Sequence, residues 1–414
     1  MIPGKVSPLI VVLQPTAFCN INCSYCYLPS RHLRNKMNPA TLARLIQVLT
    51  KSAPDTPRKL LLSWHGGEPL AAGAAFYSDA FEKSSILEKH NYIVTHAVQT
   101  NGMLLSDEFA ELFLANTVSV CVSIDGPERF HNKNRRYRSG MGTFRDVMAG
   151  IHVLKKWSIE YAVISVISEE HLEYTATYFS FMASLGVRYL ALNMPEIEGL
   201  NKTTFLSRYS DNDISSFWRD VLVLAVKHRI RVRELDYCML RFAMPIHQHE
   251  TTIPFRFLNV AYDGHYSTFD PELMGQSMAD GSKFFLGRLE CDLGNHWKTF
   301  EASQALIDIR NGVSKCKATC DYFSFCGGGP CGNKLFENGT FDSTETLACR
   351  YRIKRLVDML LMLSETDDEI VDQYAKMLLA TSPISDDLSP PLGSRSIASG
   401  RLFDVLPPYE GRSE

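Results

Sequence analysis

The sequence predicts an α/β protein built on a partial, open (β/α)6 barrel. Short apolar runs and amphipathic segments alternate six times between residues 9 and 228, a rhythm typical of a parallel sheet covered by helices. Polar or glycine-rich residues recur where the expected strands end, which is where parallel barrels carry their chemistry. Six units, rather than the eight of a closed barrel, favour an open one.

Each expected strand is a short apolar run, and each expected helix repeats apolar residues at helical spacing. The strands are expected at residues 9–13, 60–62, 94–98, 118–122, 161–167 and 189–192. The helices are expected at residues 39–49, 76–89, 107–114, 143–156, 172–185 and 213–228. Asn38 and Pro39 together form a helix start signal, since Asn caps a first turn and Pro fits within it.

The pattern divides the chain into three parts. Residues 1–230 form the barrel, and residues 231–365 form a second domain, because the strand–helix rhythm is expected to stop after Ile230. His247 and His249 form a His-x-His pair that could ligate metal, but no third ligand stands at helical spacing, so the pair is expected to be polar surface. Residues 366–414 are expected to contain one amphipathic helix at 370–379 and then a flexible tail rich in Ser, Pro, Gly and Asp.

Composition excludes several classes of function. The net charge of −3 gives no electrostatic case for binding nucleic acid or an anionic membrane. No apolar run approaches the roughly 20 residues of a membrane span, and no signal peptide is recognisable, so we expect a cytoplasmic protein. Eight of the eleven cysteines lie in two short stretches. In a reducing compartment, such clusters favour metal ligands over disulfides.

The first cluster is Cys19-x3-Cys23-x2-Cys26, directly after the first expected strand. Three thiolates in one loop can bind three irons of a [4Fe–4S] cube and leave the fourth iron open to another ligand. The alternatives are three unrelated thiols or a partial zinc site, although structural zinc usually takes four ligands from two separated pairs.

This cysteine loop resembles that of the radical S-adenosylmethionine (radical SAM) family. The resemblance implies a [4Fe–4S] cluster whose open iron chelates SAM, and reductive cleavage of SAM to a 5′-deoxyadenosyl radical. The Gly66-Gly67-Glu68 stretch after the second strand resembles the family's GGE motif, whose glycines let a strand edge approach the SAM amino group.

The resemblance also implies further SAM-binding residues. Ser123 and Asp125, at the end of the fourth strand, correspond to ribose contacts, and Arg135 corresponds to an arginine that reaches the SAM carboxylate. Arg136 and Arg138 compete for that last role, and a solvated loop cation is the alternative for Arg135. The expected SAM-binding residues are Tyr25, Gly66, Gly67, Glu68, Asn101, Ser123, Asp125 and Arg135.

The second cluster, from Cys316 to Cys349, resembles the SPASM extension of radical SAM enzymes that modify ribosomally made peptides. The resemblance implies an auxiliary [4Fe–4S] cluster held by Cys316, Cys320, Cys326 and Cys349, with a four-cysteine zinc knuckle as the alternative. A second auxiliary cluster is doubtful, because Phe269 stands where the resemblance expects a cysteine. Cys331 and Cys291 are left as unassigned thiols.

Residues 267–273 and 326–346 resemble maturases that form cyclophanes. The resemblance implies a radical SAM/SPASM maturase that abstracts a Cβ hydrogen from a precursor peptide and joins that carbon to an aromatic ring. An external reductant such as flavodoxin or ferredoxin is expected, with no nucleic acid and no membrane. A sulfatase-maturating (formylglycine-forming) enzyme and a thioether-forming maturase are the alternatives, and a non-catalytic Fe–S electron carrier is a remote one.

Asp270 is the expected general base of this reaction. In sulfatase-maturating relatives a carboxylate follows the upstream SPASM cysteine, and Asp270 keeps that place behind Phe269. The alternative is that Asp270 caps the Asp-Pro turn, and Glu272 is the other candidate base.

Overall fold

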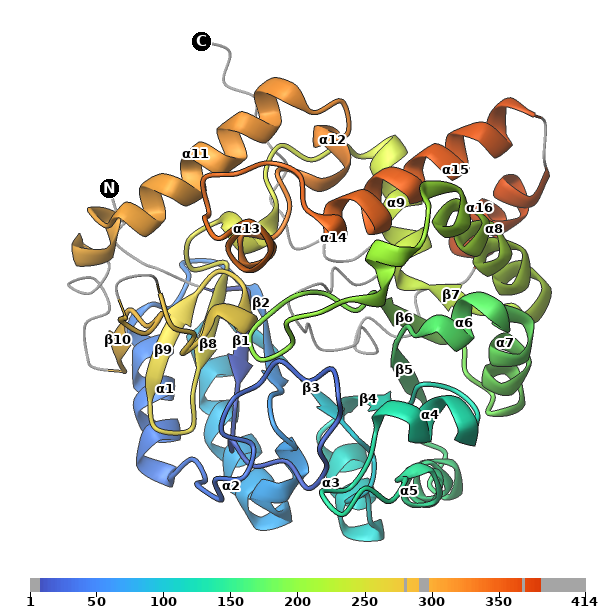
Figure 1. Ribbon diagram of the computed structural model, residues 1–414. Coiled ribbons are helices and arrows are strands. Elements are labelled where there is room, and N and C mark those ends of the chain that lie inside the picture. Colours follow the sequence, from blue (N-terminus) through green and yellow to red (C-terminus); the bar gives the residue numbers. More distant parts are fainter. Residues whose placement is uncertain (1–7, 279–280, 290–297, 367–368, 381–414) are drawn as a thin grey trace.

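The computed structural model describes residues 8–278, 281–289, 298–366 and 369–380. One curved sheet lies at its centre, with strands in the order β10-β9-β8-β1-β2-β3-β4-β5-β6-β7 (Figure 1). The strands are β1 (Ile10–Leu13), β2 (Arg58–Trp64), β3 (Tyr92–Thr100), β4 (Val118–Ser123), β5 (Tyr161–Val166), β6 (Tyr189–Asn193), β7 (Arg231–Val232), β8 (Phe257–Val260), β9 (His265–Thr268) and β10 (Gly287–Arg288). All strands from β8 to β7 in this order pair in parallel, whereas β9 and β10 pair antiparallel.

The six predicted strands are confirmed as β1 to β6, and their carboxyl ends meet at one edge of the sheet. Leu13, the last residue of β1, pairs with Trp64 in β2 and with Val260 in β8. The chain leaves β1 at this edge, so the cysteine loop that follows is delivered there. Burial of apolar side chains on both faces explains why the strands are near-continuous apolar runs.

The helices of the first half lie on the outer side of the curved sheet (Figure 1). They are α1 (Pro39–Lys51), α2 (Ala74–Ser84), α3 (Asp107–Ala115), α4 (Glu128–Asn134), α5 (Phe144–Lys156), α6 (Glu169–Glu173), α7 (Thr175–Ser184) and α8 (Asp211–His228). The Asn38 side chain accepts a hydrogen bond from the backbone N–H of Thr41, which confirms the predicted start of α1. The helix expected over 172–185 is divided into α6 and α7 at Tyr174.

The expectation that the strand–helix rhythm stops after Ile230 is wrong. β7, α9 (Arg233–Ala243) and β8 continue it, and β8 lies on the far side of β1 from β2. The apolar pieces in this region are short because β7 and β8 are short strands, so periodicity over a long window does not detect them.

Some of the remaining helices lie above the sheet, and the last two pack against α8 (Figure 1). The remaining helices are α11 (Gln304–Thr319), α12 (Phe323–Cys326), α13 (Cys331–Asn338), α14 (Leu347–Cys349), α15 (Arg355–Glu365) and α16 (Glu369–Ala380), the last of which confirms the predicted C-terminal helix. The Trp218 indole of α8 donates to the backbone oxygen of Tyr351, and the Tyr374 hydroxyl of α16 bonds Asp236 at the start of α9. The C-terminal helices are therefore tied to the barrel by buried polar contacts.

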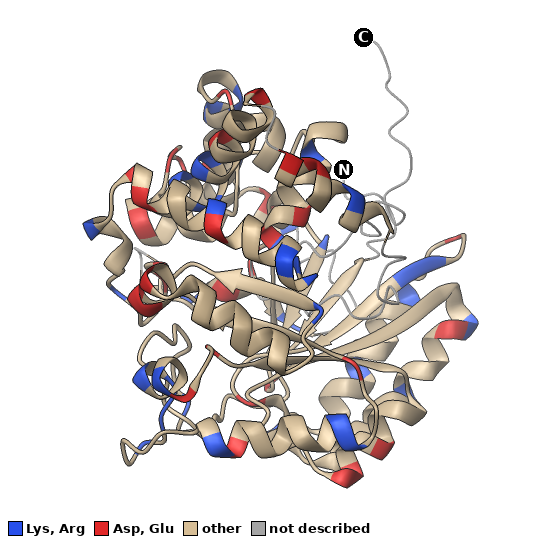
Figure 2. Ribbon diagram, turned by 90° about the vertical axis from the view of Figure 1, so that its right-hand side faces the viewer, with Lys and Arg blue, Asp and Glu red and all other residues tan. Residues whose placement is uncertain are grey.

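Basic and acidic residues are interspersed over the outer helices (Figure 2). No helix among the described residues is both long and apolar enough to cross a bilayer. The predicted tail, residues 382–414, lies outside the described residues.

Candidate functional site

The loop after β1 presents its three cysteines to a cavity of about 150 Å³ at the carboxyl edge of the sheet, here called the barrel pocket. Cys19 and Cys23 are buried and Cys26 is partly exposed. The backbone N–H of Cys19 donates to the oxygen of Arg31, and the Arg138 guanidinium donates to the oxygens of both Cys19 and Arg31. The Arg31 guanidinium also donates to the oxygen of Cys23, so two arginines and the backbone help to hold the loop in shape.

Burial and neighbouring groups act on two of the three thiols. Burial and the neighbouring acidic groups and thiols raise the pKa of Cys19 to about 12, and burial raises the pKa of Cys23 to about 12. Among the described residues, no three His, Cys, Asp or Glu side chains converge closely enough to hold a single metal ion. The ligands of a cube each bind a different iron, so a cluster does not require that convergence.

The predicted glycine turn forms one wall of the barrel pocket, and its backbone could not carry side chains. Gly66 and Gly67 both have left-handed φ angles, +89° and +61°. A Cβ on Gly67 would lie 2.5 Å from the backbone oxygen of Phe18. The absence of a side chain therefore lets the second strand's end pack directly on the cysteine loop.

Glu68 lies behind this wall rather than lining the pocket. Its carboxylate accepts hydrogen bonds from the backbone N–H groups of Leu70 and Asn101 and from the Thr100 hydroxyl, at 2.7–2.9 Å. Desolvation raises the pKa of Glu68 to about 7. Glu68 thus joins the ends of β2 and β3 and places the Asn101 side chain, which does line the pocket.

Arg135, Tyr25 and Ser123 line the opposite side of the barrel pocket, with Asp125 behind them. The Tyr25 hydroxyl donates to Asp125 Oδ2 at 2.6 Å, and Arg135 pairs with the same oxygen. Burial by itself lowers the pKa of Arg135, but Asp125, Tyr25 and Cys23 together raise it above its ordinary range, so the guanidinium is a fixed positive charge.

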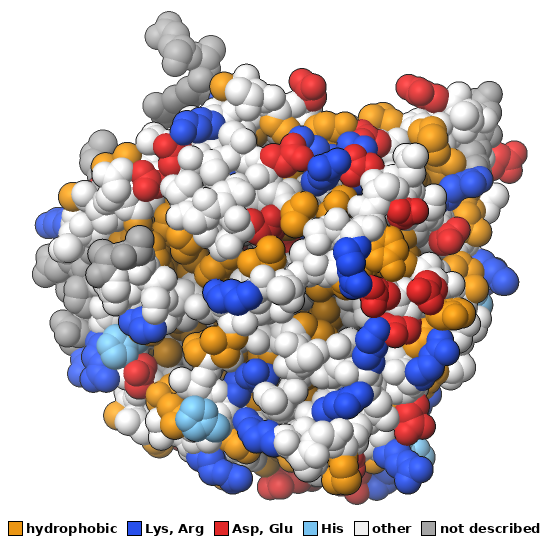
Figure 3. Space-filling view, in the orientation of Figure 1, with side chains coloured by type: hydrophobic (Ala, Val, Ile, Leu, Met, Phe, Trp, Pro, Cys, Tyr) orange, Lys and Arg blue, Asp and Glu red, His pale blue; other side chains and the backbone are white. Residues whose placement is uncertain are grey.

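The two competing arginines lie elsewhere. Arg136 is exposed and donates to the backbone oxygen of Asn132, and Arg138 is used in holding the cysteine loop. Of the three arginines, Arg135 alone is among the residues that line the pocket. The space-filling view is hollowed near the middle of this face, where hydrophobic side chains gather (Figure 3).

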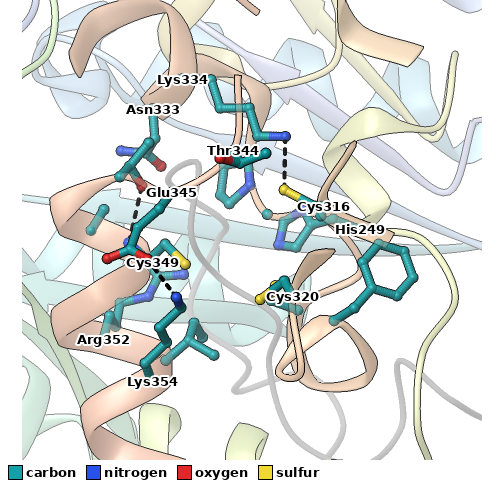
Figure 4. Close-up of a pocket in the computed structure, with 18 of the residues that line it drawn as sticks. His249, Cys316, Cys320, Asn333, Lys334, Thr344, Glu345, Cys349, Arg352 and Lys354 are labelled. Atoms are coloured by element: carbon teal, nitrogen blue, oxygen red, sulfur yellow. Dashed lines mark hydrogen bonds and ion pairs between the residues drawn. The ribbon is translucent and has the colours of Figure 1, made fainter. Parts of the chain in front are cut away.

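A second cavity of about 240 Å³, here called the C-terminal pocket, lies among the C-terminal helices. The four cysteines predicted as auxiliary ligands all line it: Cys316, Cys320, Cys326 and Cys349 (Figure 4 labels three of them). Gly327 has a φ of +59°, and a Cβ there would lie 2.4 Å from the backbone nitrogen of His249. This glycine lets the chain fold closely around the cysteines.

Several polar residues of the C-terminal pocket were missed from the sequence. The expectation that His249 is surface is wrong, because it is 4% exposed and lines the pocket beside the cysteines. Burial lowers the pKa of His249 to about 3, so its ring is neutral. The same cavity is also lined by Lys334, Arg352 and Lys354. Only the folded chain shows that these three basic residues lie around one cavity.

Cys331 does not line the C-terminal pocket. Its thiol lies 3.3 Å from Asp270 Oδ2, and the backbone N–H of Gly332 donates to that oxygen at 2.6 Å. The Asp270 side chain makes no capping bond to the 3₁₀ turn Pro271–Leu273 that follows it, so the capping alternative is not realised. Cys291, the other unassigned thiol, lies outside the described residues.

Asp270 is buried and electrostatically close to the barrel pocket. Desolvation raises the pKa of Asp270 to about 6. Glu198 lines the barrel pocket. Burial is the main cause that raises the pKa of Glu198, and the carboxylates of Glu272 and Asp270 raise it further. Both candidate bases are therefore within electrostatic range of a residue that lines the barrel pocket.

Phe269 occupies the position where the resemblance expects a cysteine. It is fully buried, packs against Phe300 with ring centroids 5.9 Å apart, and has a left-handed φ of +71°. That conformation is costly for a bulky residue and is held in place by this packing.

Glu196 connects the two pockets. It lines the barrel pocket and accepts a hydrogen bond from the Asn333 amide, while an arginine nitrogen of Arg352 lies 3.7 Å from its other oxygen. Asn333 and Arg352 line the C-terminal pocket. The two pockets therefore share a wall.

Comparison with known sequences identifies several relatives. Residues 13–181 match the model of the radical SAM superfamily. The uncharacterized protein sll1766 of Synechocystis is 36% identical over 364 residues, which cover 85% of this chain and 91% of that protein. The serine-type anaerobic sulfatase-maturating enzyme of Bacteroides thetaiotaomicron is 35% identical over 190 residues, which cover 44% of this chain and 45% of that enzyme. The match to this relative thus spans less than half of either protein.

Solved structures share the fold. The structure of anSMEcpe with bound AdoMet has a TM-score of 0.70 at 19% identity and covers 87% of this chain and 99% of that one. Streptococcus suis SuiB bound to precursor peptide SuiA has a TM-score of 0.57 at 15% identity, over 83% and 76% of the two chains. At these identities the likeness concerns the arrangement of the chain.

Proposed function

The chain belongs to the radical SAM superfamily, and on that premise we propose that it matures a ribosomally made precursor peptide by joining a side-chain Cβ to an aromatic ring carbon. The observation that carries the proposal is the wall shared by the two cysteine-lined pockets, with a buried carboxylate beside it. Oxidative crosslinking needs a radical generator, an electron acceptor and a base within one site, and with both pockets loaded this wall would bring these three groups together.

The barrel pocket would hold the cofactors. Cys19, Cys23 and Cys26 would ligate a [4Fe–4S] cluster, which together with SAM supplies a 5′-deoxyadenosyl radical that removes a hydrogen atom from the substrate. The backbone at Gly66 and Gly67 would bind the SAM amino group, and Arg135 the SAM carboxylate. Asn101 and Ser123 complete the lining, while Glu68 and Asp125 hold these groups from behind.

The C-terminal pocket would hold one auxiliary [4Fe–4S] cluster on Cys316, Cys320, Cys326 and Cys349, which supplies a one-electron acceptor. A Cβ radical that has added to a ring must still lose one electron and one proton before the ring is aromatic again. Asp270 is the group to which we assign the proton. Its pKa of about 6 leaves it ionised at neutral pH and able to accept one.

Two observations favour a crosslink over formylglycine formation. The sulfatase-maturating pattern places a cysteine ahead of the carboxylate, whereas this chain has buried Phe269. Cys331 contacts Asp270 rather than the C-terminal pocket, which supports a single auxiliary cluster among the described cysteines. A peptide substrate is supported by the relatives named as sulfatase-maturating enzymes and by SuiB, which was solved with a precursor peptide. A reductant of the flavodoxin or ferredoxin type would deliver the electron that cleaves SAM.

Co-expression of the full chain with any short, aromatic-containing peptide that a neighbouring gene encodes, followed by tandem mass spectrometry, tests this proposal. The expected product has lost two hydrogens and carries a bond between an aromatic residue and the Cβ of a nearby residue. A peptide that reacts with an aldehyde probe, or one linked through sulfur, would overturn the cyclophane assignment in favour of formylglycine or thioether formation.

A further inference from the structure

The ammonium of Lys334 is buried beside a cysteine of the C-terminal pocket. Lys334 lies on α13 and is 3% exposed, and its Nζ lies 3.3 Å from the Sγ atom of Cys316 on α11 (Figure 4). Within the described part of the chain, no carboxylate forms an ion pair with it. Lysine is almost never fully buried without a charged partner, because an isolated ammonium is costly to desolvate.

The other positive groups around this cavity are already paired. Lys354 lies 2.5 Å from a Glu345 oxygen, and Arg352 faces Glu196. His249 is neutral at ordinary pH, since burial lowers its pKa to about 3. Lys334 is therefore the positive charge at this cavity that lacks a carboxylate partner among the described residues.

The backbone is shaped to let this lysine reach the sulfur. Gly312 lies four residues before Cys316, on the same face of α11. A Cβ at Gly312 would lie 3.2 Å from Lys334 Nζ and 2.2 Å from the backbone oxygen of Phe341. A side chain at position 312 would thus push the lysine and the neighbouring loop away from Cys316.

We propose that Lys334 is a positioning residue that pairs with the auxiliary cluster and raises its reduction potential. The inference rests on the proposed auxiliary cluster. Four thiolates on an oxidised cube carry a net negative charge, which would be the partner that the buried ammonium otherwise lacks. Reduction adds one more negative charge, so a cation hydrogen-bonded to a ligand sulfur favours the reduced form. The cluster would then accept the electron released during crosslinking more readily.

The test is an EPR-monitored redox titration of the auxiliary cluster in the full chain. A background with Cys19, Cys23 and Cys26 all replaced by Ala leaves one cluster to titrate. Lys334→Met removes the charge and keeps the length, and should shift the midpoint to a more negative potential by about 59 mV or more, a tenfold change in the one-electron equilibrium. Lys334→Arg keeps the positive charge, so its midpoint potential should lie close to that of the background protein.

The matched control is Lys317→Met, which removes an exposed lysine next to Cys316 on α11. Solvent screens that charge, so its shift should be small. A Lys334→Met midpoint that matches the Lys317→Met midpoint overturns the inference. If the Met variant binds no iron, Lys334→Gln is titrated instead under the same criterion. A background protein that itself binds no iron would instead refute the auxiliary cluster, and with it the proposed function.

Discussion

The Nε atom of Arg135 lies 2.9 Å from Oδ2 of Asp125, and both side chains are almost fully buried at the edge of the barrel pocket. The Tyr25 hydroxyl, from the cysteine loop, donates to the same carboxylate oxygen. One aspartate thus fixes the direction of a guanidinium and the position of the loop that carries the cysteines.

Replacing Arg135 by Met should weaken SAM binding by about ten- to hundredfold, because a hydrogen bond to a charged group contributes about 1.5–3 kcal/mol. Equilibrium dialysis of labelled SAM with anaerobically reconstituted protein measures the change. Arg136→Met removes an exposed arginine next in the chain and should bind normally. Equal affinities in the two variants would refute the assignment of Arg135. Thermal unfolding should be recorded alongside, because Arg135→Met leaves Asp125 buried without its cation.

Gly67→Ala should abolish SAM binding, whereas Gly73→Ala should preserve it. Both glycines have left-handed φ angles, so both variants carry about 1–3 kcal/mol of backbone strain. Only at Gly67 does the new methyl group meet backbone, 2.5 Å from the Phe18 oxygen, while nothing lies within 4 Å of a Cβ at Gly73. Thermal unfolding of the two variants measures the cost of backbone strain, which both share. Equilibrium dialysis of SAM measures the effect of the clash, which is expected at Gly67 alone of the two. Similar SAM binding by the two variants would contradict the packing of the turn on the cysteine loop.

Reconstituted protein should hold about eight irons, four in each of two clusters. Cys349→Ala should lower the count to about four, because Cys349 lines the C-terminal pocket. Cys331→Ala should leave about eight, since that thiol contacts Asp270 instead. The triple Cys19, Cys23 and Cys26 to Ala variant should keep about four irons and produce no 5′-deoxyadenosine. A count near twelve in the unmodified protein would mean a third cluster and would make Cys331 a ligand, with Cys291 as its candidate partner.

Asp270→Asn should cleave SAM but yield little crosslinked peptide. In the unmodified protein, crosslinking should rise as the pH increases through about 6, because the carboxylate must be ionised to accept a proton. Desolvation is the main cause of that raised pKa, while Arg352 and the Gly332 N–H lower it and Cys331 also contacts the group. Product yield by mass spectrometry and 5′-deoxyadenosine by chromatography are measured together. Glu272→Gln is the comparison, and a wild-type crosslinking rate in Asp270→Asn would move the base assignment to Glu272.

The local features of this fold were predictable from the sequence. Asn38 capping and the buried run before the cysteine loop follow from short-range rules, and the structure has both. The four cysteines that the resemblance to the SPASM extension named all line the C-terminal pocket, whereas Cys331, which the resemblance leaves unassigned, does not.

Features that depend on distant contacts were not predictable. In the sequence, His249 is indistinguishable from a polar loop residue. In the fold, its backbone N–H donates to the oxygen of Gly327, which lies 78 residues later in the chain. Glu196 belongs to no motif, and Lys334 lies in the stretch that resembles the cyclophane maturases, but only the folded chain shows which pockets the two residues border. The strand β8 is too short to be predicted from its own sequence, and only its pairing with β1 in the structure identifies it as a strand.

The parallel pairing of β1 with β8 has a consequence for how the chain is made. β1 leaves the ribosome first, yet one of its two edges stays bare until Val260 has been synthesised. An apolar strand with an open edge is a template for unwanted pairing between chains. A nascent or truncated chain that ends near residue 230 should therefore aggregate during translation. The first strand of the barrel is also among the last to be completed.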